Sequence, residues 1–93
     1  MVIGSLQVEL FLPATFSLKE KRFIFKSIKT KIHNQFNVSV AEVAFNDKWQ
    51  KTCLGIVCVS NNRRFTDEIL SKVLNMISKD NRIEILDQHL ELF

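Results

Sequence analysis

The chain has 93 residues, a length that suits one domain around one core and is too short for two. Hydrophobic residues make up 46% of it and charged residues 25%, which excludes a disordered chain, and no apolar run approaches the ~20 residues that span a bilayer. Because the first residues also lack the basic leader and unbroken apolar stretch of a signal peptide, we expect a single cytoplasmic domain over residues 1–93 with no membrane partner.

Residues 2–12 alternate between apolar and polar side chains, which predicts a strand with one buried face. Pro13 ends this strand because proline cannot donate to a ladder of hydrogen bonds. Ser17 with Glu20 three residues later predicts a capping box, and therefore a helix that begins here and runs to Asn34. The helical periodicity assigns its core-facing stripe to Leu18, Ile24, Phe25, Ile28 and Ile32.

A second strand and a third strand follow this helix. Residues 37–43 are predicted to form the second strand, and the polar residues 46–50 a turn that contains the only tryptophan, Trp49. Residues 52–60 are apolar on both faces, which is typical of a strand in the middle of a sheet.

The rest of the chain completes a familiar order of elements. Residues 63–79 have the apolar stripe of a second helix, and residues 82–92 return as a strand whose apolar positions change phase, which predicts a β-bulge. The order β-α-β-β-α-β predicts an α+β, ferredoxin-like fold: a four-stranded antiparallel sheet, with its first and third strands in the middle and both helices on one face. Because the third strand is apolar on both sides, we expect a second copy to cover part of the open sheet face, giving a homodimer.

No group of residues has the spacing of a catalytic or metal site. Cys53 and Cys58 are five residues apart in one strand and so point to opposite faces, which predicts two free, buried thiols. His33 and His89 lack ligand spacing, and capping accounts for Ser17. The two glycines form no phosphate-binding loop. We therefore expect no metal, no cofactor and no enzymatic activity.

The first helix is strongly basic. Residues 17–33 contain six of the 13 Lys and Arg residues but only one of the ten Asp and Glu residues, although the whole chain has a net charge of only +3. Lys19, Lys21 and Arg22 lie in the first turns, where the helix dipole disfavours cations. Lys21 falls within the apolar stripe, and we expect its stem to lie over apolar surface while its ammonium reaches water.

The predicted topology brings the start of this helix to the same edge as the turn with Trp49 and the end of the second helix. Lys79 and Arg82 would join the basic residues there. Trp49 then has two interpretations: it anchors the turn in the core or, if exposed, it stacks on a base.

These features favour an anionic partner, RNA first, over the alternative that the basic helix is only a solvated face. Binding would depend mainly on phosphates, because the strands show no aromatic RNA-binding signature of the RRM kind. The predicted function is a non-enzymatic RNA- or ribosome-binding module, and the alternative is a homo-oligomeric interaction module that acts through the open sheet face. The candidate RNA- or anion-binding residues are Lys19, Lys21, Arg22, Lys26, Lys29, Lys48, Trp49 and Lys51.

Several segments, in the same order along the chain, resemble the YlxP-like family of small bacterial proteins. They are M-V-I-G at residues 1–4, S-L-K-E-K-R at 17–22 and F-N-V-S-V-A-E-V at 36–43. The resemblance implies a ferredoxin-like fold and offers no established catalytic residues. The genes of this family often lie beside those for translation initiation factor two and ribosome-binding factor A, which implies a role in translation or in maturation of the small ribosomal subunit.

Overall fold

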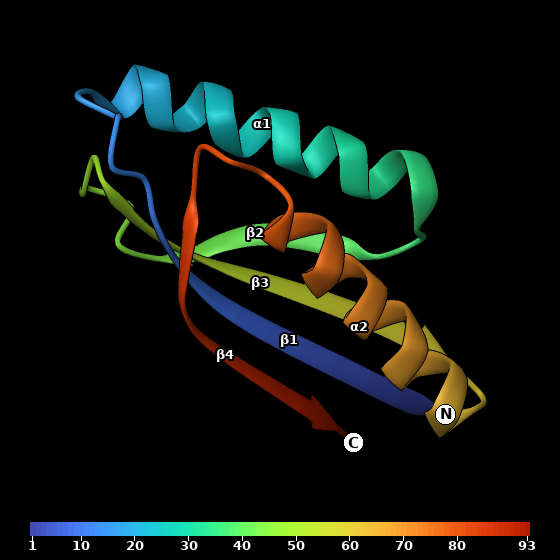
Figure 1. The fold of residues 1–93 in the computed structure, drawn as a ribbon. Helices are drawn as coiled ribbons and strands as arrows, with labels where there is room; N and C mark the ends of the chain where they lie inside the picture. Colours follow the sequence, from blue (N-terminus) through green and yellow to red (C-terminus); the bar gives the residue numbers. More distant parts are fainter.

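The computed structural model describes residues 1–93, and its elements follow the predicted order (Figure 1). The strands and helices are β1 (Val2–Phe11), α1 (Leu18–Gln35), β2 (Ser39–Ala44), β3 (Lys51–Ser60), α2 (Arg63–Ser78) and β4 (Glu84–Leu92). The predicted boundaries of the two helices and of β1 and β3 agree with these to within one residue.

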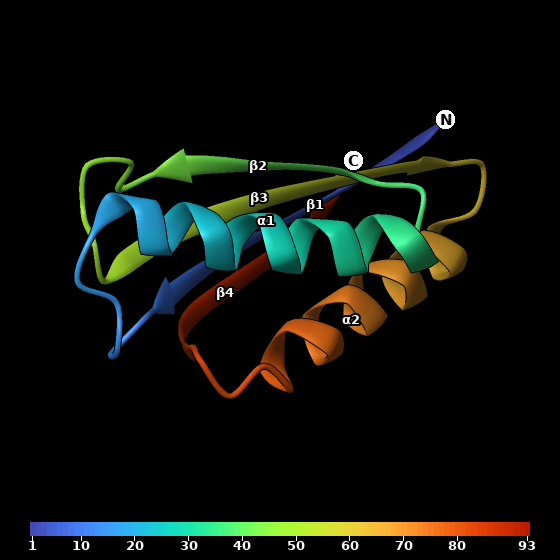
Figure 2. The same ribbon diagram turned by 90° about the horizontal axis from the view of Figure 1, so that it is seen from above.

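The four strands form one antiparallel sheet in the order β2-β3-β1-β4, so β1 and β3 lie in the middle as predicted. Both helices cover the same face of this sheet, and the other face has no helix on it (Figures 1 and 2). This is the ferredoxin-like α+β arrangement. Neither helix is long and apolar enough to cross a membrane.

The core lies between the sheet and the two helices. Alternation in β1 turns Leu6, Val8 and Leu10 toward the helices, where all three are buried. Their cross-strand partners on β3 include Leu54 and Ile56, which are also buried. The helices add the rest of the buried stripe, namely Ile28 and Ile32 from α1 and Leu70, Val73 and Ile77 from α2.

Side-chain caps begin both helices. The Ser17 hydroxyl accepts a hydrogen bond from the Glu20 backbone N–H at 3.1 Å, which confirms the predicted N-cap. The Glu20 carboxylate reaches back and accepts from the backbone N–H of Phe16 at 2.8 Å. At the start of α2, the Asn62 side chain accepts from the Phe65 N–H at 2.9 Å.

Two irregularities interrupt the sheet. In the β1–β4 pair the register shifts between Glu9 and Leu10, which confirms the predicted bulge in the last strand. This strand begins at Glu84 and not at Arg82, because the Arg82 backbone N–H is bound to the Asp80 carboxylate in a turn. A second register shift lies in the β2–β3 pair after Glu42, and the sequence did not reveal it.

Candidate nucleic-acid interface

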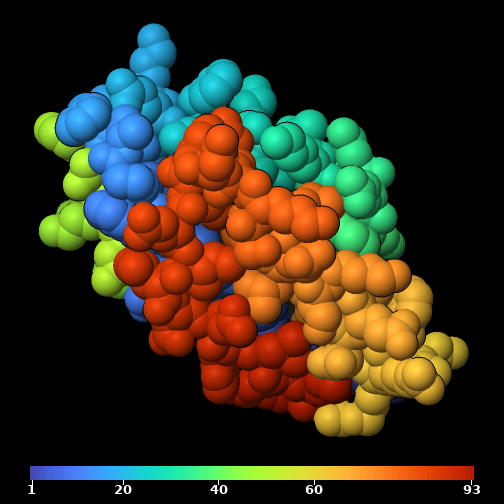
Figure 3. Space-filling view, viewed as in Figure 1, coloured from blue at the N-terminus to red at the C-terminus, as the bar shows by residue number.

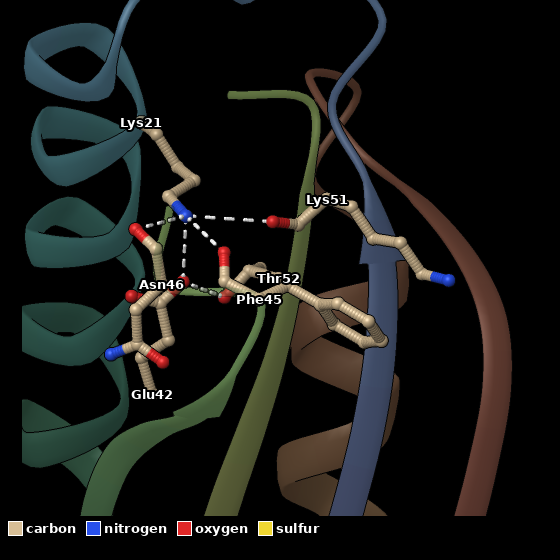
Figure 4. A network of polar contacts seen from close by, with 6 residues as sticks. All are labelled: Lys21, Glu42, Phe45, Asn46, Lys51 and Thr52. Atoms are coloured by element: carbon tan, nitrogen blue, oxygen red, sulfur yellow. Dashed lines mark hydrogen bonds and ion pairs between the residues drawn. The ribbon is translucent and has the colours of Figure 1, made fainter. Parts of the chain in front are cut away.

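Lys21 is buried, with only 2% of its surface exposed. Its ammonium lies 2.9 Å from the Glu42 carboxylate and donates to the carbonyls of Phe45 at 2.8 Å and Asn46 at 3.3 Å (Figure 4). The Lys51 carbonyl is a third acceptor at 3.5 Å. The prediction that this ammonium reaches water is therefore wrong: hairpin carbonyls and a carboxylate replace its hydration, as a buried charge requires. Lys21 does not belong to an exposed anion-binding surface.

Glu42 completes this network from the middle of β2. The same carboxylate oxygen that pairs with Lys21 accepts a hydrogen bond from the Thr52 hydroxyl of β3 at 2.5 Å. Thr52 is itself buried, and no buried side-chain nitrogen or oxygen in the structure lacks a hydrogen-bond partner. The network thus joins α1, β2 and β3 through polar groups that satisfy one another.

The Lys21 contacts attach the start of α1 to the hairpin turn of residues 45–50, which confirms the predicted proximity of these two segments. The segment after β1 makes further contacts with the turn: the Leu12 N–H donates to the Gln50 carbonyl at 2.8 Å, and the Gln50 side chain donates to the Pro13 carbonyl at 3.2 Å. In Figure 3 the yellow-green hairpin projects beside the blue start of α1.

A hollow of about 510 Å³ opens beside this hairpin. Its lining combines three aromatic side chains with two lysines and one amide: Phe11, Phe45, Trp49, Lys48, Lys51 and Gln50. Phe11 and Lys51 are cross-strand partners, and alternation with the buried pair Leu10 and Thr52 places them on the sheet face opposite the helices. Figure 4 shows the Phe45 ring and the Lys51 side chain extending away from α1. We call this feature the Trp49 hollow.

Trp49 is 53% exposed and does not belong to the hydrophobic core. The interpretation that it anchors the hairpin in the core is therefore wrong. Lys48 is exposed and forms no ion pair, whereas the Lys51 ammonium lies 4.3 Å from the centre of the Phe45 ring and 3.9 Å from the Glu9 carboxylate. The two lysines of the hollow thus differ, since only Lys48 has an uncommitted charge.

The exposed basic residues of α1 do not all lie together. Arg22, Lys26 and Lys29 follow one another at helical spacings of four and three and so form a stripe along one flank, without an ion pair to any of them. Lys19, three residues before Arg22, continues this stripe and also lines a different hollow with Phe23 and Arg82. Lys31 lies away from the stripe, in a hollow that it lines with Asp80.

Arg82 has a structural role. Its guanidinium binds the Asp80 carboxylate at 2.6 and 2.9 Å and donates to the Ser27 hydroxyl of α1 at 3.2 Å. The hydrogen bond from its side chain lowers the pKa of Asp80, and the same bond raises the pKa of the guanidinium. Arg82 lies beside Lys19 at the start of α1, as predicted, but neither Arg82 nor Lys79 lines the Trp49 hollow. These two cations therefore do not gather around Trp49.

Two aromatic residues of the hollow were not among the predicted site residues. Alternation in the first strand places Phe11 on the open face with Glu9, so that pattern is a usable signal for Phe11. Phe45 gives no such signal, because its position depends on a backbone φ of 62° after the irregular end of β2. Positive φ is uncommon for a bulky residue, and nothing in the local sequence requires it here.

The cysteines follow the prediction. Cys53 and Cys58 are free, buried and on opposite faces of β3, with Cys58 toward the helices. Burial raises the pKa of the Cys53 thiol, and the nearby Glu9 carboxylate raises it further. No three His, Cys, Asp or Glu side chains are grouped in a way that could hold a metal ion.

The fold and the Trp49 hollow thus describe a small ferredoxin-like domain, and comparison with known proteins gives its family. Residues 3–90 match the family described as "Protein of unknown function (DUF503)", so the chain belongs to this family. It is also 41% identical over 83 residues to "Uncharacterized protein YlxP" of Bacillus subtilis (strain 168), a match that covers 89% of this chain and 90% of that protein. The YlxP-like resemblance of the sequence is thereby confirmed.

Proposed function

We propose that the protein is a non-enzymatic module that binds RNA, through phosphate contacts, in the cytoplasm. The observation that supports this best is that most basic residues of α1 and the hairpin are accessible to solvent and lack an anionic partner within the protein. Six of them are solvent-accessible and form no ion pair in the structure: Lys19, Arg22, Lys26, Lys29, Lys31 and Lys48.

Unpaired cations in the first turns of a helix oppose its dipole, and neither the Lys19 nor the Arg22 side chain forms a hydrogen bond or ion pair that compensates for this. An RNA backbone supplies the missing anions, and release of its counterions drives binding. The YlxP-like gene neighbourhood points to ribosomal RNA, or the small ribosomal subunit, as the partner.

Charge reversal of the α1 stripe tests this function. We expect the triple variant Arg22→Glu, Lys26→Glu, Lys29→Glu to bind ribosomal RNA much more weakly at low salt. The slope of log affinity against log salt should fall by about 2 if the three cations contact single-stranded phosphates. Fluorescence anisotropy with labelled RNA gives both quantities, and co-sedimentation with small ribosomal subunits tests the ribosomal partner.

A matched control comes from α2, where the exposed residues Arg63, Arg64 and Lys72 can be reversed with the same change of net charge. If this control weakens binding as much as the α1 variant does, only net charge matters and α1 is not the interface. If the wild-type protein binds no RNA at low salt, the proposed function is wrong.

A second candidate function is self-association through the open sheet face. Val43, Val57 and Val59 are 53%, 40% and 58% exposed. Val57 and Val59 alternate with buried residues and so lie on the open face of β3. Val43 of β2 lies over Gly55 on the same face, where a Cβ on Gly55 would meet it at 2.8 Å. An exposed apolar patch of this kind favours a partner surface. Light scattering at high protein concentration tests it: a dimer that Val57→Lys dissociates is expected, and a strict monomer would exclude it.

A further inference from the structure

We infer that the Trp49 hollow is a stacking site for an unpaired nucleobase, with the adjoining phosphate bound by Lys48. This inference rests on the proposed function and deepens it, because it assigns single-stranded RNA as the preferred ligand.

The lining of the hollow fits a flat aromatic ligand beside an anion. Phe11 comes from the end of β1, and Phe45 and Trp49 come from the two ends of the hairpin turn, so two separate parts of the chain present rings to one space. The hollow is shallow and open, with a volume of about 510 Å³, so a base can lie against its rings without being enclosed. Aromatic rings of this kind stack on any base, while a neighbouring cation binds the backbone.

The charges of the hollow assign separate roles to its lysines. Lys51 lies over the Phe45 ring and beside Glu9, so its charge is partly balanced and its stem forms part of the wall. Lys48 is exposed and unpaired at the rim, where a phosphate attached to the stacked base would lie. A base can enter this space only outside a duplex, since paired bases are stacked within their helix.

The hollow is built before any ligand arrives. Phe45 has a positive φ of 62°, and its carbonyl accepts from both the Lys21 ammonium at 2.8 Å and the Lys48 N–H at 3.0 Å. Backbone strain of this kind persists where the surroundings enforce it, and it is concentrated at functional sites. Lys21 is therefore a positioning residue, because it holds the backbone that directs the Phe45 ring.

Trp49 is the only tryptophan, so its fluorescence reports on the hollow directly. We expect an unstructured RNA oligonucleotide to quench this emission and the same sequence within a duplex to leave it unchanged. By anisotropy with labelled single-stranded RNA, Trp49→Leu should weaken binding about 5- to 150-fold, the effect of losing one stacked base, at an unchanged salt slope. Phe23→Leu is the matched control, since Phe23 is 71% exposed and lies outside the hollow.

The possible results distinguish the stacking site from the more general proposal of RNA binding. Quenching by single strands together with loss of affinity in Trp49→Leu, but not in Phe23→Leu, supports the inference. Equal affinity for single-stranded and duplex RNA with unchanged Trp49 emission overturns it and leaves the proposed function intact. If neither form of RNA binds, the proposed function fails and the inference fails with it. The fluorescence arm uses the wild-type protein, so it remains decisive even if a variant does not fold.

Discussion

Replacing Lys21 with methionine removes a buried ammonium and keeps most of its apolar stem. The change leaves the Glu42 carboxylate without its cation and the carbonyls of Phe45, Asn46 and Lys51 without this donor. Since Lys21 attaches α1 to the hairpin, the substitution affects both the stability of the fold and the shape of the Trp49 hollow.

The magnitude follows from the burial of the pair. Removing one partner of a buried ion pair costs about 3–5 kcal/mol, because the other charge stays buried and unpaired. The Glu42 side chain is 20% exposed and keeps its hydrogen bond from Thr52, so the lower end applies. We therefore expect Lys21→Met to lower the free energy of unfolding by about 3 kcal/mol, a large part of the roughly 5–14 kcal/mol of a domain of this size.

Urea unfolding followed by circular dichroism measures this change. Lys26→Met is the matched control on the same helix. Because Lys26 is exposed and unpaired, this substitution should change the free energy of unfolding by less than about 0.5 kcal/mol. The double variant Lys21→Met, Glu42→Gln should be more stable than Lys21→Met alone, because no charge is left buried. A loss below about 1 kcal/mol in Lys21→Met, or a double variant less stable than the single one, would refute the reasoning.

Two further predictions concern stability elsewhere in the domain. The hydrogen bond from Arg82 lowers the pKa of Asp80, so this pair stabilises the fold above the unfolded-state pKa of about 3.9, and the contribution is lost as the pH falls through the folded-state pKa. Asp80→Asn should therefore be less stable than wild type at neutral pH and converge with it in acid; a constant difference in unfolding titrations would contradict this. Gly4→Ala should destabilise the fold by about 1–3 kcal/mol, because its Cβ would lie 2.3 Å from the buried Thr66 side chain. Gly55→Ala should cost less, since the exposed Val43 can yield, and equal losses in the two variants would show that the packing argument is wrong.

The predictions about the fold were confirmed where a local sequence pattern is compatible with only one structure. Alternation in residues 2–12 and the two helical stripes show which face of β1, α1 and α2 is buried, so most of the core followed from them. The order of the elements along the chain then predicted the order of the strands in the sheet. The Ser17 cap followed from the spacing of Ser17 and Glu20, and the bulge of the last strand followed from the change of phase of its apolar residues. The RNA-binding function stays a prediction, which the experiments above test.

By itself, the sequence determined the fold, the burial of both cysteines and the excess of positive charge on α1. Only the tertiary structure decided what Lys21 and Phe45 do. A lysine in an apolar stripe turns inward only if acceptors from elsewhere in the fold can bind its ammonium. The carbonyls that accept from Lys21 belong to residues 24 to 30 positions further along the chain, so the local sequence could not show them. The same contacts hold Phe45 at positive φ and so bring its ring to Phe11 and Trp49 in the Trp49 hollow, a placement that no local pattern in the chain encodes.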